Sequence, residues 1–217
     1  MTRSEGNWLK SNAARAVATT YGILVGLASI EHGIFEILQG DTPTGGIMID
    51  AIGDDIRFWE GGMETALTIV PSFLWTGILA VIFGIIVCVW AAFFVQRKYG
   101  ASVLLILTLT VFLVGGGFAP IFLSLLAVGI ATKINRPLNW WRERLPGRVF
   151  LAKLWPSLLI LFVIVFWTAV GIQIFGLPLD VTATAGIMVV FSLAMVILMP
   201  IVVIVALAYD AQKLAER

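Results

Sequence analysis

The chain has 217 residues, of which 60% are hydrophobic and 12% are charged, with a formal net charge of +1 and a mean hydropathy of +1.02. This composition excludes an ordinary soluble domain. The single cysteine, Cys88, excludes an intrachain disulfide and a cysteine-based zinc or redox site. We therefore expect residues 1–217 to form one polytopic membrane domain in contact with membrane lipids.

Four apolar runs are each long enough for the roughly 20 residues that a spanning helix needs. They cover residues 17–38, 72–95, 154–177 and 181–208. The first run follows basic residues, as a signal sequence does, but it carries ionisable residues and no convincing small-residue cleavage site, so we expect it to be retained. The sequence predicts an all-α integral membrane protein with four full transmembrane helices.

Residues 101–132 form a further apolar segment that would run about 48 Å as one helix, whereas the hydrocarbon core is about 30 Å thick. We therefore predict a helical hairpin with arms 101–114 and 118–132, each shorter than the core, which either re-enters or spans. Lipid cannot pair the free backbone groups of a turn, so the apex must face protein or a water-filled cavity and is a candidate site. The alternative is a tight hairpin whose glycines only permit close helix contact. The apex residues are Gly115, Gly116, Gly117 and Pro120.

The basic residues support the hairpin, because it places thirteen of the fourteen on one side together with both termini. If residues 101–132 crossed the membrane once, five basic residues would lie on the N-terminal side and nine on the opposite side. By the positive-inside rule, the sequence predicts both termini in the cytoplasm of a multi-pass plasma-membrane protein, and the charge pattern with one cysteine fits a prokaryotic membrane. Arg57 is the exception, and the thirteen are Arg3, Lys10, Arg15, Arg97, Lys98, Lys133, Arg136, Arg142, Arg144, Arg148, Lys153, Lys213 and Arg217.

Two connecting segments carry opposite charge. Residues 133–153 are basic and contain Trp140 and Trp141, which predicts a cytoplasmic interfacial anchor at anionic headgroups and no nucleic-acid site. Residues 40–62 are rich in glycine and aspartate and predict a structured extracellular loop, with Trp59 at the outer membrane interface. The outer half has nine acids against one base, a field that concentrates cations unless these are only solvated loop charges.

The first apolar run carries a stripe of small residues at helical spacing, which predicts a face that another helix approaches closely. Gly22, Gly26, Ser29 and Gly33 form this stripe.

Glu31, His32 and Glu36 lie near the outer boundary of the same helix. Ionisable residues at this depth seldom face lipid, so we expect them to border an outward-facing polar cavity that binds a cation or a polar headgroup. Glu60 and Glu64 could add oxygen ligands for a divalent cation if a break at Pro71 folds their segment back. The alternative is a hydrogen-bonded cluster that only locks helices together. The lone histidine excludes bis-histidine haem and multi-histidine zinc within one chain and leaves the metal or cofactor open.

No motif supports an enzymatic function. Three functional hypotheses remain. The first is transport or permeation of a cation or cationic solute, with the hairpin lining its path. The second is a structural or assembly subunit with a membrane-protein partner or a second copy of the chain. The third is a binding protein for a metal or a lipid-soluble cofactor beside His32.

Overall fold

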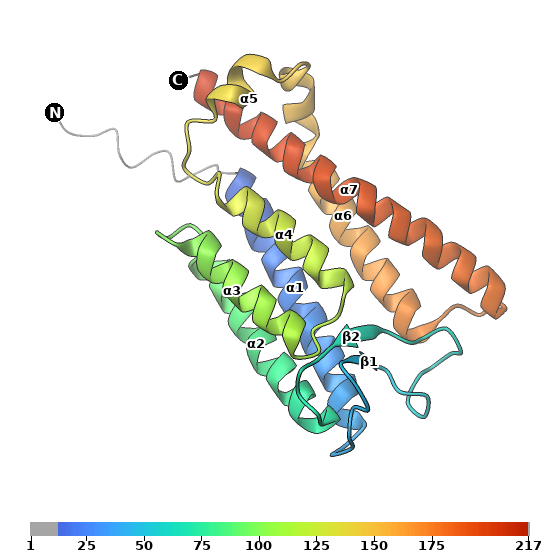
Figure 1. The fold of residues 1–217 in the computed structure, drawn as a ribbon. Coiled ribbons are helices and arrows are strands. Elements are labelled where there is room, and N and C mark those ends of the chain that lie inside the picture. Colours follow the sequence, from blue (N-terminus) through green and yellow to red (C-terminus); the bar gives the residue numbers. More distant parts are fainter. Residues whose placement is uncertain (1–12, 217) are drawn as a thin grey trace.

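A computed structural model describes residues 13–216, which form seven helices and one pair of short antiparallel strands (Figure 1). Four of these helices are long and apolar enough to cross a membrane, and two shorter apolar helices lie between them in the chain. The predicted all-α membrane class is confirmed. In chain order the elements are α1 (Ala13–Leu38), β1 (Met48–Asp50), β2 (Thr65–Leu67), α2 (Phe73–Phe93), α3 (Gly100–Leu113), α4 (Ala119–Ala131), α5 (Asn139–Arg144), α6 (Arg148–Phe175) and α7 (Val181–Ala215).

The small-residue stripe of α1 packs against α2, as predicted. A Cβ atom at Gly33 would lie 2.6 Å from the carbonyl oxygen of Gly77, so the two backbones touch. The hydroxyl of Ser29 donates a hydrogen bond of 2.9 Å to the carbonyl of Ala80. Close backbone approach of this kind maximises van der Waals contact between helices that gain nothing from the hydrophobic effect in lipid. The α1–α2 pair is thus the packed centre of the first helix group.

The predicted hairpin at residues 101–132 is confirmed as α3 and α4. Their 14 and 13 residues correspond to about 21 and 20 Å, which is shorter than the hydrocarbon core. The turn requires glycine at Gly115 and Gly117, whose φ angles are +95° and +83°. The helix pair therefore reverses at the residues that the sequence singled out.

The backbone of this turn pairs with β2. The amide of Gly115 donates to the carbonyl of Leu67 at 2.9 Å, and the amide of Phe118 donates to the carbonyl of Thr65 at 3.4 Å. The amide of Ile69 in turn donates to Leu113 at 3.0 Å. Protein, rather than lipid, thus satisfies backbone groups at the apex.

The segment between α1 and α2 contains the two strands. They pair with Met48 opposite Leu67 and Asp50 opposite Thr65. The central pair, Ile49 and Ala66, is buried and packs with Ala51 and Phe73, so a small apolar cluster lies beneath the loop. The sequence did not predict these strands, because three residues are too few for an alternating pattern to stand out.

α6 and α7 pack side by side and diverge from α1 toward the strands (Figure 1). Nearer the start of α1, Tyr21 joins α1 to both α6 and α7. Its hydroxyl donates to the carbonyl of Met199 at 2.9 Å, and its ring lies 4.9 Å from that of Phe162.

The first and last helices also meet through a charged cap. Both carboxylate oxygens of Asp210 on α7 accept hydrogen bonds from the first amides of α1, those of Ala13 at 2.7 Å and Ala14 at 2.9 Å. A negative group at this position pairs amides that have no partner within the helix and favours the positive end of the helix dipole.

The surface of α7 is apolar as well as exposed. Val190, Leu193 and Ile197 expose 64%, 58% and 58% of their area. An apolar surface of this kind is expected where lipid or another protein covers it.

The two ends of the helix bundle differ in what they contain, and they are called the basic end and the strand end. The basic end contains α5, the start of α1 and the end of α7, and the strand end contains β1 and β2 (Figure 1). The hairpin brings the α4–α5 connection to the basic end, in agreement with the charge argument. Arg3, Lys10 and Arg217 lie outside the described residues. The assignment of the basic end to the cytoplasm remains a prediction from the positive-inside rule.

We expect Gly26→Ala to lower the thermal unfolding midpoint in detergent. The added Cβ would overlap Sγ of Cys88 and lie 2.6 Å from the carbonyl oxygen of Gly84, and a backbone oxygen cannot move aside cheaply. Gly129→Ala is the matched control, because nothing lies within 4 Å of that Cβ and alanine favours a helix by up to about 1 kcal/mol over glycine. Equal midpoints for the two variants would contradict the role of the stripe.

We also expect a cysteine at position 142 to be protected in intact cells. In a Cys88→Ala background, Arg142→Cys should react with a membrane-impermeant thiol reagent only after the cells are opened, since α5 belongs to the basic end. Labelling from outside intact cells would reverse the predicted orientation.

Candidate functional site

The candidate site joins α1 to the segment before β2. Glu31 and His32 lie on α1, toward the strand end, and Glu64 immediately precedes β2. The amide of Ala51 donates to the carbonyl of Glu64 at 2.7 Å, and the side chain of Gln39 donates to the carbonyl of Ala51 at 2.8 Å. Strand pairing therefore folds Glu64 back over the end of α1.

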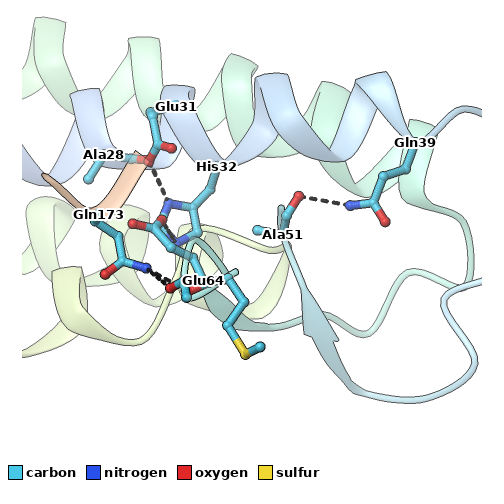
Figure 2. Close-up of polar contacts among 9 residues, drawn as sticks. Ala28, Glu31, His32, Gln39, Ala51, Glu64 and Gln173 are labelled. Atoms are coloured by element: carbon cyan, nitrogen blue, oxygen red, sulfur yellow. Dashed lines mark hydrogen bonds and ion pairs between the residues drawn. The ribbon is translucent and has the colours of Figure 1, made fainter. Parts of the chain in front are cut away.

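His32 lies between the two carboxylates (Figure 2). Its Nε2 is 3.0 Å from Oε2 of Glu64, and its Nδ1 is 3.1 Å from Oε2 of Glu31. Nδ1 is also 3.0 Å from the carbonyl oxygen of Ala28. Because a carbonyl oxygen can only accept, Nδ1 must carry the proton in that bond, which leaves Nε2 to face Glu64 and the cavity.

Glu36 lies beside this cluster and is fully buried. Neither of its carboxylate oxygens has a hydrogen-bond partner within the described chain, and the same is true of Oε1 of Glu31. Such groups are rare in folded proteins and call for a specific cause, such as an ion. The groups that act electrostatically on Glu31, Glu36 and Glu64 are His32 and other members of this set. Three carboxyl groups thus share one imidazole.

The protonation of Glu64 reflects this neighbourhood. Burial by itself would raise the pKa of the Glu64 carboxyl, but the charge of His32 and the hydrogen bond to it hold the pKa below its usual range. Glu64 is therefore poised to carry a negative charge in the folded protein.

The glycine turn lies directly against these side chains. A Cβ at Gly115 would overlap the carboxylate of Glu36, and one at Gly117 would overlap the imidazole of His32. Glycine is therefore needed at both positions for two reasons: the backbone has a positive φ, and there is no space for a Cβ atom. The hairpin apex forms one wall of the ionisable cluster.

A cavity of about 320 Å³ begins at the cluster and extends between α1, α4, α6 and α7. Glu31, His32 and Glu64 form its polar end, while most other lining side chains are apolar. Pro120 lines it, whereas Gly115, Gly116 and Gly117 do not. Phe162 lines this space, and behind it lies the ring of Tyr21, whose hydroxyl donates to the carbonyl of Met199.

Gln173 completes the polar end and was not predicted from the sequence. Its side-chain nitrogen donates to the carbonyls of Met63 at 2.7 Å and Gly61 at 3.3 Å, and its backbone carbonyl accepts from Nε1 of Trp59 at 2.8 Å. These bonds fasten the loop to the end of α6. The only sequence signal was a lone amide in an otherwise apolar helix.

Some of the site residues predicted from the sequence join the cluster, and others do not. The structure brings Glu31, His32 and Glu64 together, with Glu36 adjacent but outside the cavity lining. Glu60 is exposed on the loop and does not join the cluster in the described chain. Trp59, for which a place at the membrane interface remains a prediction, lies against Gly61, Gly62 and Gly176.

The cluster has the composition of a metal site. Glu31, His32 and Glu64 each offer one ligand atom, and these atoms lie within 4.8 Å of one another. Once Nε2 of His32 has lost its proton, one imidazole nitrogen with two carboxylate oxygens suits a divalent transition metal, and the Nδ1 bond to Ala28 is the type of support that orients a histidine ligand.

The fold and its apolar helices are those of a multi-pass membrane protein with an ionisable cluster at the end of an apolar cavity. Comparisons with family models, with curated proteins and with solved structures find no match to this chain.

We expect Gly115→Ala to destabilise the protein more than Gly45→Ala. Both residues have positive φ, +95° and +70°, so the backbone strain is similar, about 1–2 kcal/mol. Only the first meets a neighbour, because nothing lies within 4 Å of a Cβ at Gly45. Adding Glu36→Ala to Gly115→Ala should restore part of the lost thermal midpoint. Identical losses for the two glycines, or no recovery in the double variant, would contradict packing of the turn on Glu36.

Proposed function

We propose that the protein binds a cation at the Glu31–His32–Glu64 cluster, as the recognition step in moving a cation or cationic solute into or across the membrane. The observation that carries this proposal is the geometry of the buried cluster: the imidazole of His32 lies between the carboxyl groups of Glu31 and Glu64, and carboxyl oxygens of Glu31 and Glu36 have no hydrogen-bond partner in the described chain. A bound cation would give these oxygens a partner.

The physical cost of leaving such a cluster without compensation is large. A buried ionised carboxylate is destabilising by several kcal/mol unless it is paired. A unit positive charge at about 4 Å from a carboxylate would return about 4 kcal/mol at an effective dielectric constant of 20. A cation bound between Glu31 and Glu64 acts on two carboxylates at once and reaches Glu36 as a third, more distant, partner.

The surface at the strand end supports the same proposal. Asp41, Asp50, Asp54 and Asp55 lie exposed on the loop that covers the cluster, and Arg57 is already paired with Asp54 at 2.9 Å. A field of this sign raises the local concentration of cations before they bind. Movement beyond the cavity requires α6 and α7 to separate from α1 where Tyr21 joins them.

The test is the effect of cations on thermal stability in detergent. Mn²⁺, Zn²⁺, Ca²⁺ and methylammonium are titrated against the wild type, Glu64→Gln and Glu60→Gln. The last variant removes the same charge from an exposed residue of the same loop and is the matched control. A ligand at 100 times its Kd stabilises the folded state by about 2.7 kcal/mol.

We expect at least one cation to raise the midpoint of the wild type and of Glu60→Gln, with the effect lost in Glu64→Gln. An equal rise in Glu64→Gln would place the binding elsewhere. No rise with any cation, alkylammonium ions included, would mean that protons neutralise the cluster and would favour a purely structural role.

A further inference from the structure

The cavity behind the cluster is shaped for an apolar molecule rather than a bare ion. Its volume of about 320 Å³ lies at the lower end of the range of small-molecule sites, about 300–1,000 Å³. Methionine side chains adapt to irregular apolar ligands, and aromatic rings give them broad contact. The aromatic and thioether lining between the helices includes Phe118, Phe162, Phe166, Met188, Met195 and Met199.

The polar end of the cavity offers hydrogen-bond acceptors. The side-chain nitrogen of Gln173 already donates to two backbone carbonyls, which leaves its oxygen. Oε1 of Glu31 has no partner, and the Nδ1 proton of His32 is directed to Ala28 and Glu31. A ligand head that fits this end must therefore bring its own donors and a positive charge. An ammonium group supplies both.

A second cavity of about 190 Å³ lies between α1 and α6, beside the first. It shares four lining residues with the first cavity, Ala28, Glu31, Phe166 and Val170, so the two cavities are direct neighbours. Ile34 and Trp167, on its outer side, are 48% and 45% exposed on the apolar helix surface. A movement of the shared side chains would join the two cavities and give an apolar molecule a path between α1 and α6 that avoids the polar loop.

We propose that the ligand is an amphiphilic organic cation, a small lipid-soluble amine that enters between α1 and α6 and binds with its ammonium group at Glu31 and Glu64 and its apolar part among the phenylalanines and methionines. This inference rests on the proposed cation site and names its substrate class. Charge complementarity at one end and apolar complementarity along the rest of the cavity select this occupant over a hydrated metal ion and over a neutral lipid.

The experiment is photolabelling of the full chain in lipid nanodiscs. The probe is decylamine with a diazirine on its alkyl chain, and the reference is the decyl alcohol with the diazirine at the same carbon. Labelled residues are identified by peptide mass spectrometry. We expect the amine to label Phe166, Met195 and Met199 at least about tenfold more than the alcohol does, the ratio that 1.4 kcal/mol of binding free energy produces.

Three variants separate the contributions. Glu64→Gln should reduce labelling by the amine to the level of the alcohol. Ala28→Leu adds volume at a residue that lines both cavities and should abolish labelling by both probes. Ala185→Leu adds the same volume on the exposed surface of α7 and should label like the wild type. Retention of the small-cation thermal shift shows that Ala28→Leu is folded, and unlabelled decylamine as a competitor on the wild type provides a second measure of the same site.

The outcomes distinguish this inference from the proposed function. Equal labelling by amine and alcohol, or labelling unaffected by Glu64→Gln and by the competitor, overturns the proposal that the ligand is an amphiphilic cation. Stabilisation by small cations in the same protein would still support the cation site. If the amine gives no specific labelling and no cation changes the thermal midpoint, both proposals are overturned. Amine-specific labelling of the cavity lining that Ala28→Leu abolishes supports the inference.

Discussion

The pairing of β2 with the α3–α4 turn is the interaction on which the site depends. A helix reversal within the apolar part of a membrane protein leaves backbone N–H and C=O groups that lipid cannot satisfy. β2 supplies partners for Gly115 and Phe118 and thereby draws the loop into the helix group. The same pairing sets Glu64 against His32 and the turn glycines against His32 and Glu36. A requirement of the backbone thus assembles the ionisable cluster.

The cavity lies between two groups of helices, α1 to α4 and α6 with α7, which are in contact at only some points along their length. α1 to α4 pack around small residues, while α6 and α7 pack chiefly on each other and meet α1 through α7. Tyr21 and Asp210 fix that contact toward the basic end. Toward the strand end the gap is bridged by the loop through Trp59 and Gln173. Apolar space with a polar end is what remains between these two attachments.

Much of the architecture could be predicted from the sequence because its signals are local. Apolar length gave the spans, a glycine cluster in mid-segment gave the hairpin, and helical spacing placed Gly26 and Gly33 on one face. All three depend on residues near one another in the chain. The charge distribution then chose between two topologies, because each placed the same basic residues differently.

The site could be predicted only in part, because tertiary contacts determine the rest. Glu31 and His32 stood out as ionisable residues in an apolar helix, but helix spacing alone could not show that His32 lies between Glu31 and Glu64. Strands of three residues left no pattern that could bring Glu64 back and leave Glu60 exposed. The cavity lining comes from four helices distant in sequence, so its apolar character could not be read from any one of them.

The Asp210 cap has a consequence for biogenesis. The partner of the first amides of α1 lies 197 residues further along the chain, on the last helix. Chains are synthesised from the N-terminus, and their early segments fold before later ones exist. The start of α1 therefore enters the membrane with those amides unpaired by Asp210, and they receive that partner only when translation reaches α7. The start of α1 is therefore completed only after α7 has been made, and the Asp210 contact then ties α1 to α7.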